Sequence, residues 1–411
     1  MRGYKFHAAQ RGLPTTVAAA ALLGASALAG CGGDDQAAGN GNNNGSSGPN
    51  ACDNFFVING VGSLPGAGNA ASHGQPARID SDILVDSPEC TAAGKRNVHV
   101  SKIVQVSNDF GGASNGDVTF QTDTGLIDSC VANAGGYRIL VMMEAGGPNE
   151  TAARAALDRI KLTNTPDTLV NGKLTLSTKA VIDPPPNPAP QDEPCSPPGT
   201  GGQPGSPGFP GTSGGQPGTG GQSGTGHSFS TTEPRASIFV ALPGTPSYVF
   251  KHTTQTGSIF ASGFSGSEVD FTSDSGQLDL VGGHWDVSNL ISDEGAVNVS
   301  GDHAAVTATT TNGPIKATLA TVRSSNATVH AGLGDAEVIL QPTGTPGFDL
   351  FASTGSGAAT ISVTGTDPQT VTPAPTPPAD SKHSKSAGFD GSTVKVQVHA
   401  SSQNGDVSIH E

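Results

Sequence analysis

The chain has 411 residues, of which 58 are Gly and 30 are Pro, so about a fifth of it consists of residues that interrupt regular structure. Aromatic residues make up only 5%, with a single Trp, which argues against the core of a conventional large enzyme. Lys and Arg number 20 against 35 Asp and Glu, and this balance argues against a nucleic-acid partner because such binding needs dense positive charge.

The first 30 residues have the features of a lipoprotein signal peptide (residues 1–30). A basic segment, residues 2–11, precedes an apolar run over residues 13–29, as in a secretory signal. The run closes with Leu28-Ala29-Gly30-Cys31, which resembles the bacterial lipobox. That resemblance implies cleavage just before Cys31 and a thioether link to diacylglycerol, so the expected partner is a lipid bilayer reached through acylated Cys31. An ordinary signal peptide followed by a structural Cys is the alternative.

Residues 31–51 are rich in Gly and Asn, have no hydrophobic pattern, and are expected to form a flexible tether. Cleavage removes three of the 20 basic residues and none of the 35 acidic ones, which leaves a net charge of −18. Anionic lipid headgroups repel such a chain, so acyl chains must hold it at the membrane. Gly32 stands where Asp is associated with retention at the inner membrane. The expected location is therefore the bacterial cell envelope, with the outer membrane favoured over the inner membrane.

Four further cysteines are candidates for disulfide bonds: Cys52, Cys90, Cys130 and Cys195. An exported protein occupies an oxidising compartment, where an even number of cysteines indicates two disulfides with three possible connectivities. Zinc binding is the alternative, but no two of these cysteines have CxxC spacing and no His lies at ligand spacing from them. We therefore expect no metal and no other cofactor.

Residues 52–182 are expected to form a β-rich region with one helix. Aliphatic residues predict several strands, among them Val98–Val104 and Ile139–Met143. Asn149 can cap a helix over residues 150–160, whose Ala and Leu residues fall on one face.

Residues 183–234 are expected to be a linker rich in Gly and Pro. Glycines recur at every third position in two short blocks between Gly199 and Gly224, which is the pattern of a collagen triple helix. The blocks are too short and too poor in Pro to support a trimer, so we expect a flexible spacer.

From residue 235 to residue 411 the sequence repeats. The first four copies have a Gly every 18 or 19 residues, with Ser or Thr three residues before it and an aliphatic residue two residues after it. The repeat-turn glycines, including the looser later copies, are Gly257, Gly276, Gly295, Gly313, Gly334, Gly357 and Gly405. A segment this short buries its apolar side only by stacking on the next copy, which predicts a β-solenoid with coils about 4.8 Å apart. A β-sandwich with coincidental spacing is the alternative.

The repeated segments, the closing Asn404-Gly405-Asp406-Val407 and the helix and strand of residues 149–180 resemble the bacterial putative adhesin family of β-strand-repeat domains of unknown function. The resemblance covers most of residues 98–411. It implies a mostly β fold, a right-handed single-stranded β-helix with one short helix ahead of it, at the cell envelope and without established catalytic residues. The chain departs from the family in its linker and in a Pro- and Thr-rich insertion over residues 367–388, which is expected to be disordered.

Patterns with catalytic or metal-binding potential have simpler explanations. Gly112, Ser114 and Gly116 match the spacing of a hydrolase nucleophile elbow, but a strand follows them, which favours a hairpin turn. His284 and His303 are one repeat apart and could share a metal ion on adjacent coils, yet no third ligand is evident, and exposed loop histidines are favoured. Five acidic residues are expected to make one flank acidic, without calcium-loop spacing: Asp270, Asp274, Asp279, Asp286 and Asp293. No catalytic residue is expected.

We therefore expect a non-enzymatic envelope lipoprotein with adhesin-like binding of a glycan or an envelope protein through the solenoid surface. The hydroxyl and amide side chains expected on that surface include Ser273, Thr309, Thr310, Asn312 and Asn326. Binding through such neutral groups should tolerate salt. The second possible function, after adhesin-like binding, is that of a structural spacer of the envelope. A β-helix carbohydrate-active enzyme is the third, and the scarcity of basic residues between positions 236 and 320 disfavours it.

Overall fold

The computed structural model describes residues 76–86, 89–90, 94–132, 136–186, 233–369 and 380–411. The predicted signal peptide and tether, and most of the predicted linker, therefore lie outside the described residues. Everything that is described belongs to one compact unit of the chain. No helix within it is long and apolar enough to cross a membrane.

Among the described residues strands dominate, with one α-helix and one short 3-10 helix. The elements before the linker are β1 (Ala77–Asp80), β2 (Leu84–Val85), β3 (Glu89–Cys90), β4 (Arg96–Asp109), β5 (Asn115–Thr124), β6 (Ile127–Ala132), β7 (Gly136–Gly147), α2 (Glu150–Leu157), β8 (Ile160–Val170) and β9 (Lys173–Ile182). The elements after it are β10 (Arg235–Pro243), β11 (Ser247–Thr256), β12 (Ile259–Ser262), β13 (Gly266–Ser275), β14 (Leu278–Glu294), β15 (Val297–Thr310), β16 (Ile315–Thr321), β17 (Ser325–Ala331), β18 (Ala336–Pro342), β19 (Gly347–Thr354), β20 (Ala359–Ser362), β21 (Asp367–Pro368), β22 (Asp380–Lys385), η1 (Phe389–Gly391), β23 (Lys395–Ser402) and β24 (Val407–His410).

Most strands stack in two columns of parallel strands, which we call column A and column B. In order of pairing, column A contains β9, β5, β11, β13, the second halves of β14 and β15, β17, β23 and β19. Column B contains β10, β6, β12, the first halves of β14 and β15, β16, β18, β24 and β20. Ile259 pairs with Leu278 and Leu278 with Val297, so the 19-residue period is the length of one coil. The predicted stacking of repeats is present, whereas a β-sandwich would need antiparallel neighbours.

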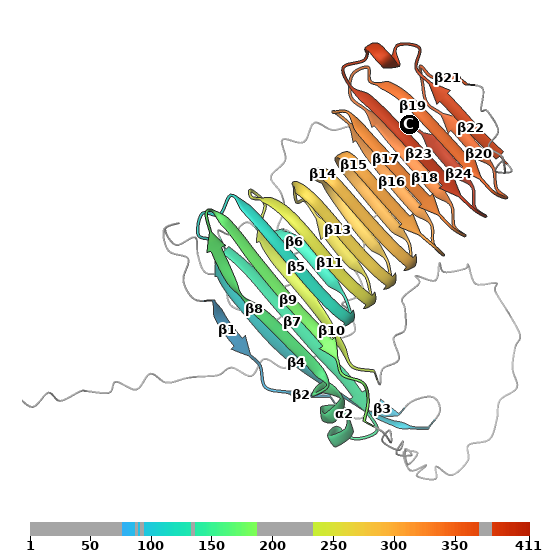
Figure 1. The fold of residues 1–411 in the computed structure, drawn as a ribbon. Helices are drawn as coiled ribbons and strands as arrows, with labels where there is room; N and C mark the ends of the chain where they lie inside the picture. The colour runs from blue at the N-terminus through green and yellow to red at the C-terminus, as the bar shows by residue number, and fades with distance from the viewer. Residues whose placement is uncertain (1–75, 87–88, 91–93, 133–135, 187–232, 370–379) are drawn as a thin grey trace, which may run out of the picture. The chain divides into compact units, whose positions relative to one another are not determined.

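The order of the coils in the stack differs from their order in the sequence at two places. The coil of β5 and β6 pairs on one side with β9 and β10 and on the other with β11 and β12. Near the C-terminus, β23 and β24 lie between the coil of β17 and β18 and the coil of β19 and β20, although they follow all four strands in sequence (Figure 1). The region before the linker and the repeats after it therefore share both columns.

Antiparallel strands continue the columns at their ends, so the sheet is mixed and not a purely parallel solenoid. In column A, β8 pairs with β9 at one end and β22 pairs with β19 at the other. In column B, β10 is followed by β7, β4 and β1. Because β22 lies within the predicted insertion at residues 367–388, the expectation of disorder is wrong for residues 380–385. The open backbone edge of β19 gives this polar segment a pairing partner that its composition does not reveal.

The α-helix α2 begins where the sequence predicts and ends earlier. The Asn149 side chain accepts a hydrogen bond from the N–H of Ala152 at 2.9 Å, which is the expected N-cap. The helix ends at Leu157 because Ile160 already begins β8. It packs against β7 and β4.

Side chains alternate between the interior and the outside along each strand of the columns. In column B the aliphatic residues that follow each turn, such as Leu278 and Val297, are buried as predicted. In column A the coils of β5, β11 and β13 place a ring stack in the interior. There His252 lies between Phe120 and Phe271, with ring centroids 5.1 Å apart on both sides. Alternation of this kind decides which polar residues can reach a partner.

Candidate functional site

The recurring Gly and the Ser or Thr three residues before it form one internal column. Ser273 Oγ donates a hydrogen bond to the carbonyl oxygen of Gly257 at 2.9 Å, and Ser292 Oγ donates to that of Gly276 at 2.9 Å. Equivalent bonds to the glycine of a neighbouring coil come from Thr310, Thr354 and Ser402. Each hydroxyl therefore ties its own coil to the next one in the stack.

The repeat glycines are required by the close approach of neighbouring coils. A Cβ atom on Gly257 would lie 1.8 Å from the carbonyl oxygen of Gly125, and one on Gly276 would lie 1.8 Å from that of Gly257. The same contact, at 2.0 to 2.3 Å, applies to Gly295, Gly313, Gly334, Gly357 and Gly405. No side chain fits between such carbonyls, so the glycine of each repeat follows from packing between coils.

This internal column corrects the prediction that the repeat hydroxyls face a partner. Ser273 and Thr310 are each only 1% exposed. Ser273 lies on the inward side of its strand together with Phe271, since side chains alternate along a strand. Thr309 and Asn326 do lie on the outward side of their strands. The outer surface is therefore built from a different set of polar residues than the repeat motif suggests.

The cysteines are only partly covered by the structure. Cys130, in β6, is disulfide-bonded. Cys31, Cys52 and Cys195 lie outside the described residues, as does the side chain of Cys90. The expected pair of disulfides and the lipidation of Cys31 therefore stay predictions.

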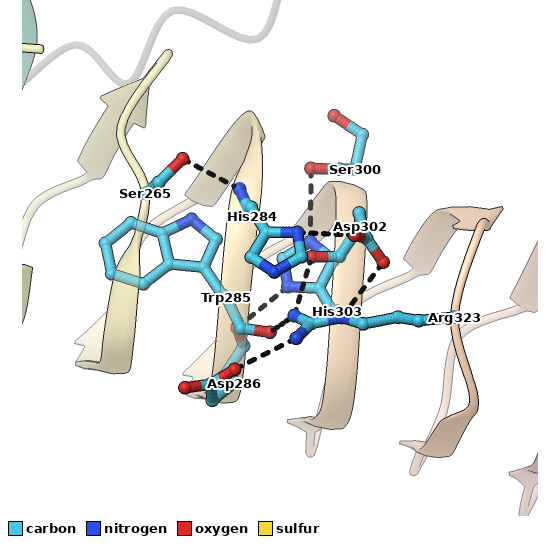
Figure 2. Close-up of polar contacts among 9 residues, drawn as sticks. Ser265, His284, Trp285, Asp286, Ser300, Asp302, His303 and Arg323 are labelled. Atoms are coloured by element: carbon cyan, nitrogen blue, oxygen red, sulfur yellow. Dashed lines mark hydrogen bonds and ion pairs between the residues drawn. The ribbon is translucent and has the colours of Figure 1, made fainter. Parts of the chain in front are cut away.

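A compact group of charged side chains occupies the corner where the chain passes from column B to column A (Figure 2). Arg323 donates from Nε to Asp302 Oδ1 at 3.2 Å, from Nη1 to Asp286 Oδ1 at 2.9 Å, and from Nη2 to the carbonyl oxygen of Trp285. His284 Nδ1 lies 2.5 Å from the other carboxylate oxygen of Asp302. Because the Asp302 side chain is only 11% exposed, these contacts satisfy a nearly buried carboxylate. Arg323 thereby joins three successive coils.

The hydroxyl groups of this corner cluster are used for internal bonds. Ser265 Oγ accepts from the backbone N–H of His284 at 3.1 Å, and Ser288 Oγ lies 2.9 Å from His303 Nδ1. A carboxylate beside an imidazole orients a general base in hydrolases when that same imidazole also contacts a nucleophile. Here Asp302 contacts the imidazole of His284, whereas the Ser288 hydroxyl contacts the buried imidazole of His303, so the two contacts belong to different histidines. The cluster fits a brace between coils better than it fits a catalytic group.

His284 and His303 do not stack on one another. A bulge just before His284 shifts the register by one residue, so His284 pairs with Asp302 whereas His303 pairs with Trp285. His303 is 1% exposed, and this burial lowers its pKa. The expectation of an exposed loop histidine is therefore wrong for His303, and the two imidazoles form no shared metal site. Within the described ranges, no three His, Cys, Asp or Glu side chains converge as metal ligands.

The acidic residues predicted to form one flank are divided among several surfaces, so that expectation is also wrong. Asp270 faces outward from column A and accepts from Asn289 Nδ2 at 2.8 Å. Asp279 faces outward from column B and accepts from Asn298 Nδ2 at 2.6 Å. Burial raises the pKa of Asp279. Asp286 belongs to the corner cluster. The two Asp–Asn pairs each join adjacent coils, since their members are one 19-residue period apart.

The outward side of column A carries two ordered rows of mostly polar side chains. One row consists of Thr253, Thr272, Ile291, Thr309, His330 and Ser401. The row beside it consists of Lys251, Asp270, Asn289, Thr307, Thr328 and His399. The second row continues into Phe351, whose ring centroid lies 5.9 Å from that of His399 and 6.3 Å from that of His383. Successive members of a row are one strand spacing apart, about 4.8 Å.

A shallow pocket of about 440 Å³ opens on the outward side of column B, next to the column of glycines. We call it the glycine-side pocket. Its polar lining residues are Asn298, Lys316, Asp335, Glu337, Asp406 and Ser408. Lys316 Nζ lies 3.2 Å from one Glu337 carboxylate oxygen, and His410 Nε2 lies 3.1 Å from the other. Burial favours a higher pKa for Glu337, but the hydrogen bonds from His410 and Lys316 outweigh it and hold that pKa below its usual value.

The stacked register and the internal glycine column are the features by which the repeats can be compared with known domains. Residues 249–410 match the model of the Toastrack DUF4097 family. The match runs from β11 to the end of β24 and confirms the predicted β-strand-repeat family.

Two solved structures are similar to the chain. One is a putative cell adhesion protein from Clostridium sporogenes, with 12% identity over 79% of this chain and 99% of that one, and a TM-score of 0.28. The other is a putative adhesin from Bacteroides fragilis, with 10% identity over 75% of this chain and 96% of that one, and a TM-score of 0.22. No curated protein sequence matches the chain significantly.

Sequence reasoning missed the corner cluster and the glycine-side pocket. Arg323 is the single Arg in the Toastrack range, residues 249–410, and that isolation was the available signal for the cluster. Lys316 and Glu337 are 21 residues apart, close to one coil, and opposite charges at that spacing were the signal for the pocket. Ser114 lies in the turn before β5, where its N–H donates to the carbonyl oxygen of Gly172 at 2.9 Å, so its elbow-like spacing belongs to a turn.

Proposed function

We propose that the chain is a non-enzymatic, adhesin-like binding protein of the bacterial cell envelope, anchored through acylated Cys31. In this proposal the outward side of column A contacts a glycan or an envelope protein. The coils wind as a right-handed, single-stranded helix, the hand that parallel β-crossovers almost always adopt.

The observation that carries the proposal is the pair of polar rows on the outward side of column A. Stacking places a polar side chain at most strands of each row, and Thr307 and Thr328 within the rows are exposed. A periodic surface of this kind suits a periodic or extended partner, because each added coil adds an equivalent contact. The rows mix hydroxyl, amide and a few charged groups, which supports binding that depends on hydrogen bonds more than on net charge.

The test is binding by the full chain carrying Cys31→Ser, which removes the expected lipid anchor. The chain is presented to an array of polysaccharides and to envelope extracts at 0.1 M and 1 M salt. Saturable binding that survives high salt is expected. Thr307→Glu with Thr328→Glu should weaken it, whereas Ser262→Glu with Ser362→Glu, two exposed positions on column B, should not.

The structural spacer is the second candidate, and the antiparallel strands at the column ends favour it, because they pair backbone groups that would otherwise be open to partners. Absence of saturable binding under every condition would leave this candidate ahead. Release of new reducing ends from a bound polysaccharide would instead support the carbohydrate-active enzyme.

A further inference from the structure

We propose that the glycine-side pocket is a binding subsite for one or two units of a neutral saccharide. The inference rests on the proposed binding function and names a substrate class for it, at a place separate from the rows of column A. A volume of about 440 Å³ lies within the range of ligand pockets, about 300 to 1,000 Å³.

The pocket is lined by two parallel rows that cross successive coils. Asn298, Lys316, Glu337 and Ser408 occupy one row, since Asn298 pairs with Lys316, Lys316 with Glu337, and Glu337 with Ser408. The second row, nearer the glycines, contains Asp335 and Asp406. A linear ligand lying along the stack would meet both rows at once.

The second row of the pocket, nearer the glycines, holds two carboxylates that are fixed by backbone hydrogen bonds. Asp335 Oδ1 accepts from the backbone N–H of Asp406 at 2.8 Å, and Asp406 Oδ1 accepts from the N–H of Ala358 at 2.8 Å. These bonds fix each carboxylate through one oxygen, and the second oxygen is a further hydrogen-bond acceptor. Both residues are exposed, so water solvates their carboxylates when no ligand is bound and no desolvation penalty is paid in the free protein.

The first row of the pocket, which contains Asn298, Lys316, Glu337 and Ser408, supplies hydrogen-bond donors beside these acceptors. Lys316 Nζ contacts one Glu337 carboxylate oxygen and has further N–H groups that can donate to a ligand, while Ser408 contributes a hydroxyl. Asn298 uses Nδ2 on Asp279, which fixes its amide and leaves the oxygen as an acceptor. A sugar hydroxyl both donates and accepts, so it can bridge a carboxylate and an ammonium group, and vicinal hydroxyls match alternating donors and acceptors.

The charge of the pocket selects among saccharides. Asp335, Glu337 and Asp406 outnumber Lys316, which leaves an excess of negative charge that repels uronic acids. A bound metal ion is not the better explanation, because no three acidic or imidazole side chains converge among the residues described. The pocket therefore fits an uncharged, hydroxyl-rich ligand.

Saturation-transfer NMR on the full chain with Cys31→Ser tests this, using cellobiose and N,N′-diacetylchitobiose as neutral probes and glucuronate as the anionic probe. Saturable binding of at least one neutral probe is expected, with glucuronate bound at least about fivefold more weakly. Lys316→Met should weaken the neutral probe about fivefold or more. Lys382→Met is the matched control, since its side chain is also 54% exposed and is paired with Asp380, and it should have no effect.

Asp335→Asn provides the second arm, because it keeps the acceptor for the Asp406 N–H while removing one negative charge. It should narrow the preference for neutral probes over glucuronate. Equal binding of glucuronate and the neutral probes by the unchanged chain, or equal losses in Lys316→Met and Lys382→Met, would overturn the inference. Failure of every disaccharide to bind while polysaccharide binding persists would overturn the subsite and leave the proposed function standing.

Discussion

Adding one methyl group to the glycine column should destabilise the stack strongly. Gly276→Ala places a Cβ atom 1.8 Å from the carbonyl oxygen of Gly257, whereas real Cβ contacts stay above 3.0 Å, so the two coils must separate locally by about 1 Å. That movement strains the buried hydrogen bond from Ser273 Oγ to the carbonyl oxygen of Gly257, which crosses the same gap between coils. Overpacking costs about 1 to 3 kcal/mol and a lost hydrogen bond about 1 kcal/mol. We expect the free energy of unfolding to fall by about 2 to 4 kcal/mol.

The measurement is guanidinium unfolding followed by fluorescence, since Trp285 is the only Trp in the chain and is fully buried. Gly388→Ala is the matched control, because a Cβ there meets nothing within 4 Å and the residue has no positive φ. This control should remain within about 0.5 kcal/mol of the unchanged chain. The reasoning is refuted if Gly276→Ala unfolds at the same denaturant concentration as the unchanged chain, or if the control loses as much stability.

Three further changes test other parts of the molecule. Arg323→Met should lower the free energy of unfolding by about 3 kcal/mol, because it leaves the Asp302 carboxylate nearly buried with His284 as its remaining partner, and unchanged stability would contradict the brace. Burial lowers the pKa of His252 from 6.5 to about 4, so between those values the unfolded chain binds a proton that the folded chain does not. The free energy of unfolding should therefore fall by up to about 3 kcal/mol as the pH drops from 6.5 to 4. In melting experiments across this pH range, His252→Phe should make the fall smaller. The same dependence of stability on pH in both proteins would contradict the assignment to His252. Cys31→Ala should move the protein from the detergent phase to the aqueous phase of a detergent extraction, and equal partitioning of both forms would count against lipidation.

The stacked coils could be predicted because their signal is local and repeated. A Gly every 18 or 19 residues, followed by alternating aliphatic residues such as Leu278 and Leu280, fixes both the coil length and the buried side. The inward position of Ser273 was also available, since it shares its alternation with Val269 and Phe271. The expectation that Ser273 faces a partner rested on its polar side chain and not on its place in this alternation.

Other features depend on contacts that the local sequence does not encode. The bulge that separates His284 from His303 lies at two glycines with positive φ, Gly282 and Gly283. The presence of glycine in the sequence does not by itself predict a change in strand register. The strand β22 forms because β19 offers an edge, and nothing in the sequence of β22 resembles the repeats. The glycine-side pocket combines residues of four strands, so it becomes visible only once the pairing is known.

Because β23 and β24 lie inside the stack, the last coils cannot complete their pairing until the C-terminal residues have been synthesised. Ribosomes make β19 and β20 before the strands that separate them from β17 and β18, so during that interval the two neighbouring coils face each other across a missing layer. Direct pairing between them would exclude the later coil, and residues 395–410 must therefore arrive before that alternative becomes permanent. A nonsense mutation between residues 363 and 394 would leave β19 without its parallel neighbour. Such shortened products should be substrates for proteases rather than partly active molecules.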